Sequence, residues 1–177
     1  MQPILETPRL RLEPARSEHL ETLFALWTDP DVRRFLWDDV AIEREKARET
    51  LRSFEDLGAR GLGLWVFATR NGTSDPIIGC AGLSPVGASS QYYSASAGAV
   101  EPIVALAPQF WHQGYAQEAV AVLVDYAIRT LKLNRLVGAT DVPNVRSDRL
   151  LRRLSFVPCA ETDGPRYRLR HYRYGRI

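Results

Sequence analysis

The fold is decided by residues 108–119, which read Pro108-Gln109-Phe110-Trp111-His112-Gln113-Gly114-Tyr115-Ala116-Gln117-Glu118-Ala119. An apolar run, residues 103–107, precedes them, and apolar residues recur at steps of three and four over 119–131. This pattern predicts a strand, a tight turn and a helix. Small residues at Gly114 and Ala116 let a ligand approach the main chain closely. Because the first N–H groups of a helix lack intrahelical partners and carry its positive dipole end, such a turn can bind phosphate.

The spacing at this turn excludes two common nucleotide motifs. Neither Gly-x-x-x-x-Gly-Lys-Ser/Thr nor Gly-x-Gly-x-x-Gly occurs in the chain. What stands here is Gly114-Tyr115-Ala116 followed by Glu118-Ala119. Taken alone, this pattern also fits an ordinary strand-to-helix turn, so its flanks have to decide.

Other segments extend the pattern in a fixed order. The residues that carry it are Thr7-Pro8-Arg9-Leu10-Arg11-Leu12, Glu101, the apolar residues 103–106, Pro108, Phe110-Trp111, Gly114-Tyr115-Ala116, Glu118-Ala119, Asn144-Val145-Arg146-Ser147 and Leu154-Ser155-Phe156. Their order and spacing resemble the GNAT acetyltransferase superfamily, and more closely its branch of ribosomal-protein alanine N-acetyltransferases. The resemblance covers nearly the whole chain, which makes it more specific than any single motif.

Three positions depart from that pattern. His112 stands where the branch often has a second glycine, and its side chain narrows the pyrophosphate turn unless it points outward. Ser155 replaces the glycine before Phe156, at an expected helix end. Many members of the superfamily have a tyrosine seven residues after the position of Asn144, where this chain has Leu151.

The resemblance implies an α/β (α+β) GNAT fold. Its mixed central sheet has about six to seven strands flanked by helices, and two parallel strands splay apart to form the cofactor wedge. Residues 1–177 form a single domain in this reading, because 177 residues, 45% hydrophobic and 25% charged, suffice for one core.

Composition also limits the function classes. A net charge of +2 is nearly balanced and argues against non-specific DNA binding. We find no apolar stretch of 18 residues and no basic-then-apolar leader, so we expect a soluble cytoplasmic protein without a membrane partner. Cys80 and Cys159 are expected to be reduced core residues. The three histidines share no metal-ligand spacing, so no metal is expected.

The first third of the chain reads as helical after an initial strand at 10–13. Ser17 is placed to cap a helix through Trp27, and Asp29-Pro30 ends it and begins a second short turn. Residues 41–57 form a charged amphipathic pattern closed by Gly58.

Two aromatic residues near this helical pair have two readings. The resemblance places the pair beside the acceptor site, so Phe35 and Trp37 either line that site or pack beneath the helices.

Residues 64–69 and 77–83 predict a hairpin with its turn at Asn71-Gly72. Residues 84–98, with Tyr92-Tyr93 inside, read as a connection.

The last third of the chain is expected to supply the second strand of the cofactor wedge, a helix and a final strand. Residues 133–141 predict a strand parallel to 101–107 after a right-handed crossover, and 144–154 a helix capped by Asn144 or Ser147. The tail, 166–174, alternates at period two and predicts a final strand. Its arginines fit a charged edge strand, and its interleaved aromatics leave RNA binding as an alternative.

The resemblance assigns acetyl-CoA as cosubstrate. Main-chain groups of Val104, Ala105 and Leu106 would pair with the pantetheine, and Asn144 would contact the cofactor arm. The N–H groups that would hold the pyrophosphate are those of His112, Gln113, Gly114, Tyr115, Ala116 and Gln117.

The resemblance also names the chemistry. Glu101 matches an acidic residue that takes the ammonium proton, directly or through water, in some relatives; alternatively it pairs with an arginine or caps a loop. A main-chain N–H near Leu106 would stabilise the thioester oxyanion. With Leu151 in the tyrosine position, Ser147 would protonate the thiolate, unless it only caps its helix.

The function expected is therefore acetyl transfer from acetyl-CoA to a primary amine. The acceptor is the α-amine of a protein or a small molecule, and exposed strands at the end of the fold are compatible with a homodimer. Two alternatives stay open: a catalytically idle acyl-CoA-binding or sensor module on the same fold, and a ribosome- or RNA-binding protein.

Overall fold

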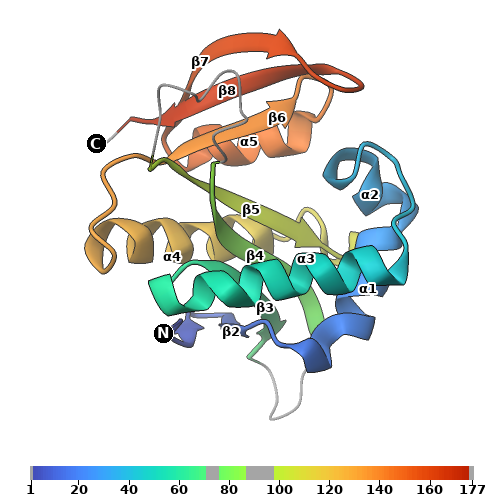
Figure 1. The fold of residues 1–177 in the computed structure, drawn as a ribbon. Helices are drawn as coiled ribbons and strands as arrows, with labels where there is room; N and C mark the ends of the chain where they lie inside the picture. Colours follow the sequence, from blue (N-terminus) through green and yellow to red (C-terminus); the bar gives the residue numbers. More distant parts are fainter. Residues whose placement is uncertain (1, 71–75, 87–97, 176–177) are drawn as a thin grey trace.

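The computed structural model describes residues 2–70, 76–86 and 98–175 (Figure 1). In these ranges the strands are β1 (Leu5–Glu6), β2 (Leu10–Pro14), β3 (Gly63–Thr69), β4 (Ile77–Pro85), β5 (Val100–Leu106), β6 (Val137–Asp141), β7 (Phe156–Asp163) and β8 (Arg168–Tyr174). The α-helices are α1 (Leu20–Thr28), α2 (Pro30–Leu36), α3 (Arg44–Asp56), α4 (Tyr115–Arg129) and α5 (Val145–Arg153). The expected turn at Asn71-Gly72 and the Tyr92-Tyr93 pair lie outside the described residues.

The strands form two antiparallel sheets that meet at one parallel bridge. The first has the order β1-β2-β3-β4-β5, and the second has the order β6-β8-β7. Val100 at the start of β5 bridges Leu136 just before β6, in parallel orientation. The α/β class with splayed parallel strands is confirmed, and the splay is wide enough to divide the expected sheet in two.

Helices cover both faces of the larger sheet (Figure 1). On β3, Leu64 and Val66 pack with α1 and α3, whereas Trp65 and Phe67 pack with α4. Successive residues of a strand point to opposite faces, and helices cover both faces of this sheet. All four side chains are therefore buried. This is why β3 reads as a continuous apolar run instead of an alternating one.

Helix α4 is the crossover between β5 and β6. Its buried residues recur at steps of one, three and four along one stripe: Ala119, Val120, Leu123, Val124, Tyr126 and Ala127. The helix begins at Tyr115, immediately after Gly114, as the sequence of residues 108–119 predicts. The stripe packs on β2, β4 and β5, so the first turn of α4 is held beside the end of β5.

Two of the expected helix boundaries are wrong. Ser17 does not cap α1, because Ser17–His19 forms a 3-10 turn in which the Arg16 N–H donates to His19 Nδ1 at 2.9 Å. Gly58 does not end the helical segment after α3, because a 3-10 turn continues over Leu57–Arg60 and the chain leaves it at Gly61, with φ of 73°. Asp29 does cap α2, accepting from the N–H groups of Asp31 and Val32.

Strand β7 was not expected, and it changes the place of β8. The tail strand is central in the second sheet, between β6 and β7, so the expectation of an edge strand is wrong. Pro158 hid β7 from sequence inspection, since proline within an apolar run normally argues against a paired strand. In the structure the register shifts between Pro158 and Ala160, so the proline lies at a bulge.

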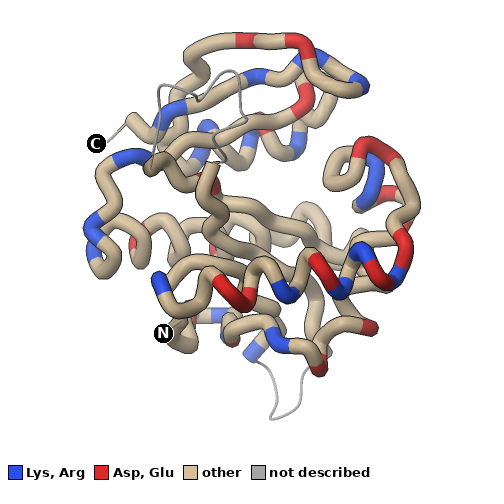
Figure 2. Tube along the Cα trace, viewed as in Figure 1, with Lys and Arg blue, Asp and Glu red and all other residues tan. Residues whose placement is uncertain are grey.

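Most charged side chains lie on the surface, and Asp141 is the buried exception among the described residues. Figure 2 shows both signs interspersed along α3, where Lys46 pairs with Glu49 and Arg48 with Glu45. Cys80 and Cys159 are not joined in a disulfide. Within residues 2–70, 76–86 and 98–175, no helix combines the length and the apolar character needed to cross a membrane.

Serine at position 155, where the resembled family has glycine, is expected to lower the free energy of unfolding. Ser155 follows α5 with φ of 68°, a left-handed conformation in which its N–H donates to Arg152 O at 3.1 Å. A residue with a Cβ is strained there, whereas glycine is not. We predict that Ser155→Gly raises the free energy of unfolding by about 0.5–1 kcal/mol in urea denaturation.

A matched serine controls for the chemistry of that change. Ser53 lies inside α3 on its solvent side, so Ser53→Gly is expected to lower the free energy of unfolding by about 0.5 kcal/mol. Equal losses in the two variants would contradict the explanation of Ser155.

Candidate active site

A cleft opens where β5 and β6 diverge beyond their single bridge. The Val100 N–H donates to Arg135 O at 3.1 Å, and past this bond β5 and β6 are not paired. The cleft has a volume of about 720 Å³ and takes its walls from β5, β6, the first turn of α4, α5 and the end of α2. All but one of the predicted site residues line it; the exception is Gln113.

The register of β5 decides which of its main-chain groups face the cleft. The Ala107 N–H donates to Ile78 O at 2.9 Å, so the odd-numbered residues of β5 pair with β4. The even-numbered residues turn the other way, and of these the N–H groups of Val104 and Leu106 have no acceptor among the described residues. Ala105 therefore lines the cleft, but its main chain bonds to β4 and is not available for pantetheine.

Residues 112–117 present a row of free donors. None of their six N–H groups donates to an acceptor in the described part of the chain, and the first intrahelical bond of α4 runs from Glu118 N to Gly114 O at 3.0 Å. Gly114 has φ of 84°, and a Cβ there would lie 3.3 Å from Arg9 Nη2. The positive φ therefore favours glycine, and a side chain there would also displace the Arg9 guanidinium slightly.

His112 keeps the shape of this turn despite its side chain. Its φ of 63° is left-handed, which explains why glycine is common at this position in the resembled branch. The residue is exposed at the rim of the cleft, so the neighbouring N–H groups stay accessible. Holding a histidine in this conformation costs on the order of 1 kcal/mol.

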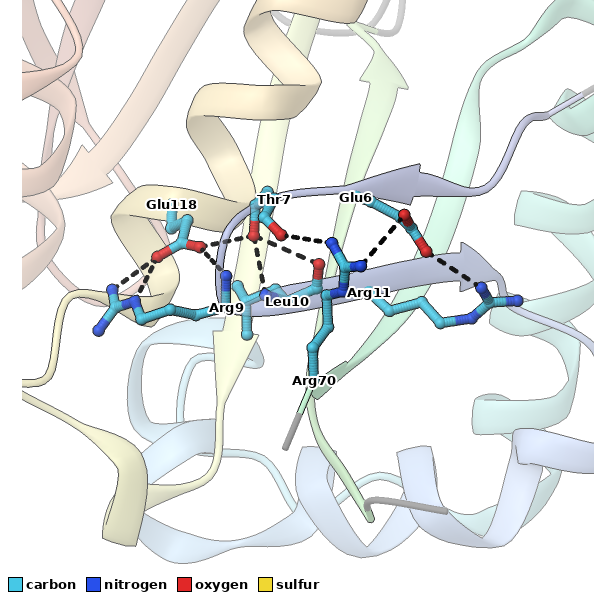
Figure 3. A network of polar contacts seen from close by, with 7 residues as sticks. All are labelled: Glu6, Thr7, Arg9, Leu10, Arg11, Arg70 and Glu118. Atoms are coloured by element: carbon cyan, nitrogen blue, oxygen red, sulfur yellow. Dashed lines mark hydrogen bonds and ion pairs between the residues drawn. The ribbon is translucent and has the colours of Figure 1, made fainter. Parts of the chain in front are cut away.

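The opening motif of the chain clamps the first turn of α4 (Figure 3). Glu118 accepts hydrogen bonds from Thr7 Oγ1 at 2.5 Å, Arg9 N at 3.0 Å and Arg9 Nε at 2.7 Å. Arg9 also donates to Gln113 O at 3.0 Å and lies over the ring of Tyr115 at 4.6 Å. Sequence reasoning noted Thr7, Arg9 and Glu118 as motif residues without seeing that they meet.

Asn144 and Ser147 lie together at the start of α5. The Ser147 N–H donates to Asn144 Oδ1 at 3.2 Å, so Asn144 is the cap. The hydroxyl group of Ser147 is not used for capping, and both residues line the cleft. This decides between the two caps that the sequence left open.

Glu101 spans the wedge from β5 to β6. Its Oε1 accepts from the Ala139 N–H at 2.6 Å, and no arginine pairs with it among the described residues. Burial raises the pKa of Glu101 to about 7, and the hydrogen bond from Ala139 offsets part of that rise. A carboxyl group with this pKa exchanges protons near neutral pH.

Phe35 and Trp37, which the sequence placed either in the acceptor site or beneath the helices, lie in different surroundings. Phe35 lines the cleft and contacts the ring of Tyr167 at 6.1 Å between centroids. Trp37 packs instead against Trp27, at 6.0 Å, within the core of α1 and α3. Another wall residue, Trp111, donates to Leu106 O at 2.7 Å and lies under the guanidinium of Arg146 at 4.1 Å.

The chain that forms this cleft matches a known protein family over most of its length. The sequence model of the acetyltransferase (GNAT) domain matches residues 9–157. The chain belongs to the GNAT acetyltransferase family. Acetyl-CoA is the acetyl donor in this family, and the protein is an acetyl-CoA-dependent acetyltransferase.

Individual relatives agree with this assignment. The chain is 29% identical over 152 residues to the uncharacterized N-acetyltransferase p20 of Bacillus licheniformis, covering 86% of this chain and 81% of that protein. A GNAT-family acetyltransferase structure from Bordetella pertussis has a TM-score of 0.83 at 21% identity, covering 98% and 100% of the two chains. RimL, a ribosomal L7/L12 α-N-protein acetyltransferase solved with coenzyme A, has a TM-score of 0.76 at 18% identity, covering 96% of each. At these identities the two structures show the fold alone.

The clamp on α4 predicts a pH-dependent contribution to stability. Burial alone would raise the pKa of Glu118, but the bonds from Thr7 and Arg9 lower it below its usual value. The stabilisation is therefore present above the unfolded pKa of 4.5 and is lost as the pH falls through the lower folded pKa. We predict that Glu118→Gln lowers the free energy of unfolding by about 1 kcal/mol at pH 7, because water screens the half-exposed Arg9.

The difference from the wild type should shrink in acid, which urea titrations across pH can follow. Glu6→Gln is the control, because Glu6 pairs with Arg11 and Arg70 in the same region but is 46% exposed. A pH-independent effect of Glu118→Gln would contradict the role of its charge.

Proposed function

We propose that this acetyltransferase moves the acetyl group of acetyl-CoA to a primary amine, with Glu101 as the proton acceptor. The observation that carries the proposal is the place of Glu101 at the apex of the wedge. It lies in the same cleft as the free N–H groups of Val104 and Leu106. A base and an oxyanion donor are the two groups that amine acylation needs.

Residues on both sides of the cleft are placed to contact acetyl-CoA. N–H groups of residues 112–117 would hold the pyrophosphate, since they are unpaired and stand at the positive end of α4. Val104 and Leu106 would pair with pantetheine as a neighbouring strand would, and Asn144 would contact its arm from α5. Acetyl-CoA supplies an acetyl group activated as a thioester.

Proton transfer is assigned to two side chains. An ammonium group is not a nucleophile, so Glu101 takes its proton before attack, directly or through water. The Leu106 N–H stabilises the oxyanion that forms on attack. Ser147 donates to the departing thiolate, because this residue lines the cleft and its helix is already capped by Asn144.

The alternatives have less support. Arg170 pairs with Asp148 at 2.9 Å and with Glu161, and Arg168 pairs with Glu161 at 3.4 Å, so these tail arginines are engaged within the protein. An idle acyl-CoA-binding module would not require a carboxyl group that titrates near neutral pH in the wedge. The expected homodimer stays a prediction, which the elution volume of the purified protein tests.

The pKa of Glu101 predicts a pH profile. Only the carboxylate accepts a proton, so kcat/KM should rise with pH through about 7. Glu101→Gln should lower kcat/KM by about 100-fold and flatten this limb, with acetyl-CoA affinity unchanged. Proximity of amine and thioester should preserve a residual rate. If turnover of every amine stays at the wild-type level, Glu101 is not the base.

Stability gives a second readout for the same variant. Because the folded pKa of Glu101 is above its unfolded value, ionisation costs folding free energy as the pH rises through 7. Glu101→Gln removes that cost and should be more stable than the wild type in alkali. Ser147→Ala serves as the comparison: it should lower kcat but leave the pH limb in place, and an unchanged kcat would remove Ser147 from the mechanism.

A further inference from the structure

Asp141 is a buried acidic residue whose side chain has no hydrogen-bond or ion-pair partner in the described part of the chain. It is the last residue of β6, is 6% exposed and lines the cleft. No hydrogen bond or ion pair reaches its side chain from any described residue. Burial and the nearby Asp38 raise the pKa of Asp141, while Arg166 lowers it. The Asp141 carboxylate opens onto the cleft and accepts no hydrogen bond from a described residue, so a donor or cation bound in the cleft can complete its contacts.

A second carboxyl group faces the same space. Asp38 and Asp39 follow α2 with φ of 51° and 67°, an uncommon pair of left-handed residues. Ion pairs hold this turn, because Asp39 contacts Arg33 at 3.4 Å and Arg166 at 2.9 Å. Arg166 is therefore engaged by Asp39, and Asp38 lines the cleft without an ion pair to any described residue.

The two carboxyl groups come from elements on opposite walls. Asp38 belongs to the loop after α2, whereas Asp141 ends β6, and Asp31 of α2 lines the cleft as well. Asp141 is buried and Asp38 is exposed at the rim of the cleft; their like charges repel, and a bound cation would relieve the repulsion and the desolvation of Asp141. The cleft residues offer Arg146, Arg149 and Arg153 only on α5.

The position of Asp141 relative to Glu101 sets the geometry of a ligand. Glu101 accepts from the Ala139 N–H of β6, and Asp141 lies two residues further along the same strand and lines the same cleft. Residues two apart on a strand are about 7 Å from each other. A cation at Asp141 would therefore lie one short aliphatic chain away from an amine at Glu101.

We propose that Asp141 and Asp38 bind a second positively charged group of the acceptor. The acceptor is then an amine that carries another ammonium or guanidinium group a few carbons away. This inference rests on the proposed function, which places the reacting amine at Glu101. The second cation has two sources: the other end of a small diamine, or a basic side chain next to a peptide α-amine.

The test compares matched acceptors that differ in one charge. Putrescine and cadaverine are assayed against butylamine and pentylamine, and the dipeptide amide Ala-Lys against Ala-norleucine. The wild type should prefer the dications by roughly ten-fold or more in kcat/KM, the size of a charge-assisted contact. The larger preference, among diamines or among peptides, identifies the source of the cation. Equal kcat/KM for charged and uncharged partners would overturn the proposal.

Variants assign the preference to the two carboxyl groups. Asp141→Asn and Asp38→Asn should each reduce the dication preference to about two-fold. Asp125→Asn is the matched control, because Asp125 is 56% exposed on α4, pairs with Arg129 and does not line the cleft. Because no protein donor reaches Asp141, Asp141→Asn should unfold at or above the wild-type temperature. A lower unfolding temperature would show a structural role and overturn the proposal.

A binding measurement separates this inference from the proposed function. Putrescine is titrated calorimetrically into the wild type and Asp141→Asn, each saturated with CoA. Weaker binding to the variant supports the inference even if no amine is acetylated, an outcome that would reject the proposed function alone. Equal binding, or none to either protein, overturns the inference whatever the acetylation assay shows.

Discussion

The separation of β5 from β6 after one bridge is the constraint on which the site depends. Strands that continued in register would satisfy each other's main-chain groups. Here the Val100–Leu136 bridge is followed by Pro102, which has no N–H, and then by free donors at Val104 and Leu106. Unpaired donors inside a cleft cost free energy until a ligand accepts from them. An extended, amide-bearing molecule can therefore pair with the free main-chain groups of β5 as a neighbouring strand would.

Several contacts keep that separation in place. At the narrow end of the cleft, the Glu101 carboxylate accepts from the Ala139 N–H. At its wide end, the Trp111 indole N–H donates to Leu106 O. The clamp of Thr7 and Arg9 on Glu118 fixes the first turn of α4 beside the cleft. The same side chains thus position the donors and limit how far the two sheets can close.

Local signals in the sequence were enough for most of the fold. The 3.6-residue periodicity placed α4, and the Asp29-Pro30 pair placed the start of α2. β7 was missed because Pro158 interrupts it, and this error moved β8 from the centre of its sheet to an edge. A bulge that accommodates a proline depends on the partner strand, which local propensity does not describe.

The site was predictable where it follows one segment and unpredictable where distant segments meet. The donors of residues 112–117 follow from a helix start, but the exclusion of Ala105 main-chain groups depends on the register of β5 against β4. The clamp of Arg9 on Glu118 joins residues far apart in the sequence. The facing of Asp38 and Asp141 likewise needs the wedge to be built first, so no acidic cluster was visible along the chain.

Calorimetric titration with acetyl-CoA tests most directly whether the turn before α4 holds the pyrophosphate of acetyl-CoA. Gly114→Trp fills that turn, and Gly98→Trp is the control, because Gly98 has φ of 88° but no heavy atom within 4 Å of an added Cβ. We predict binding on the order of micromolar for the wild type and Gly98→Trp, and its loss in Gly114→Trp. Equal affinity in all three proteins, or no binding to the wild type, would contradict the account.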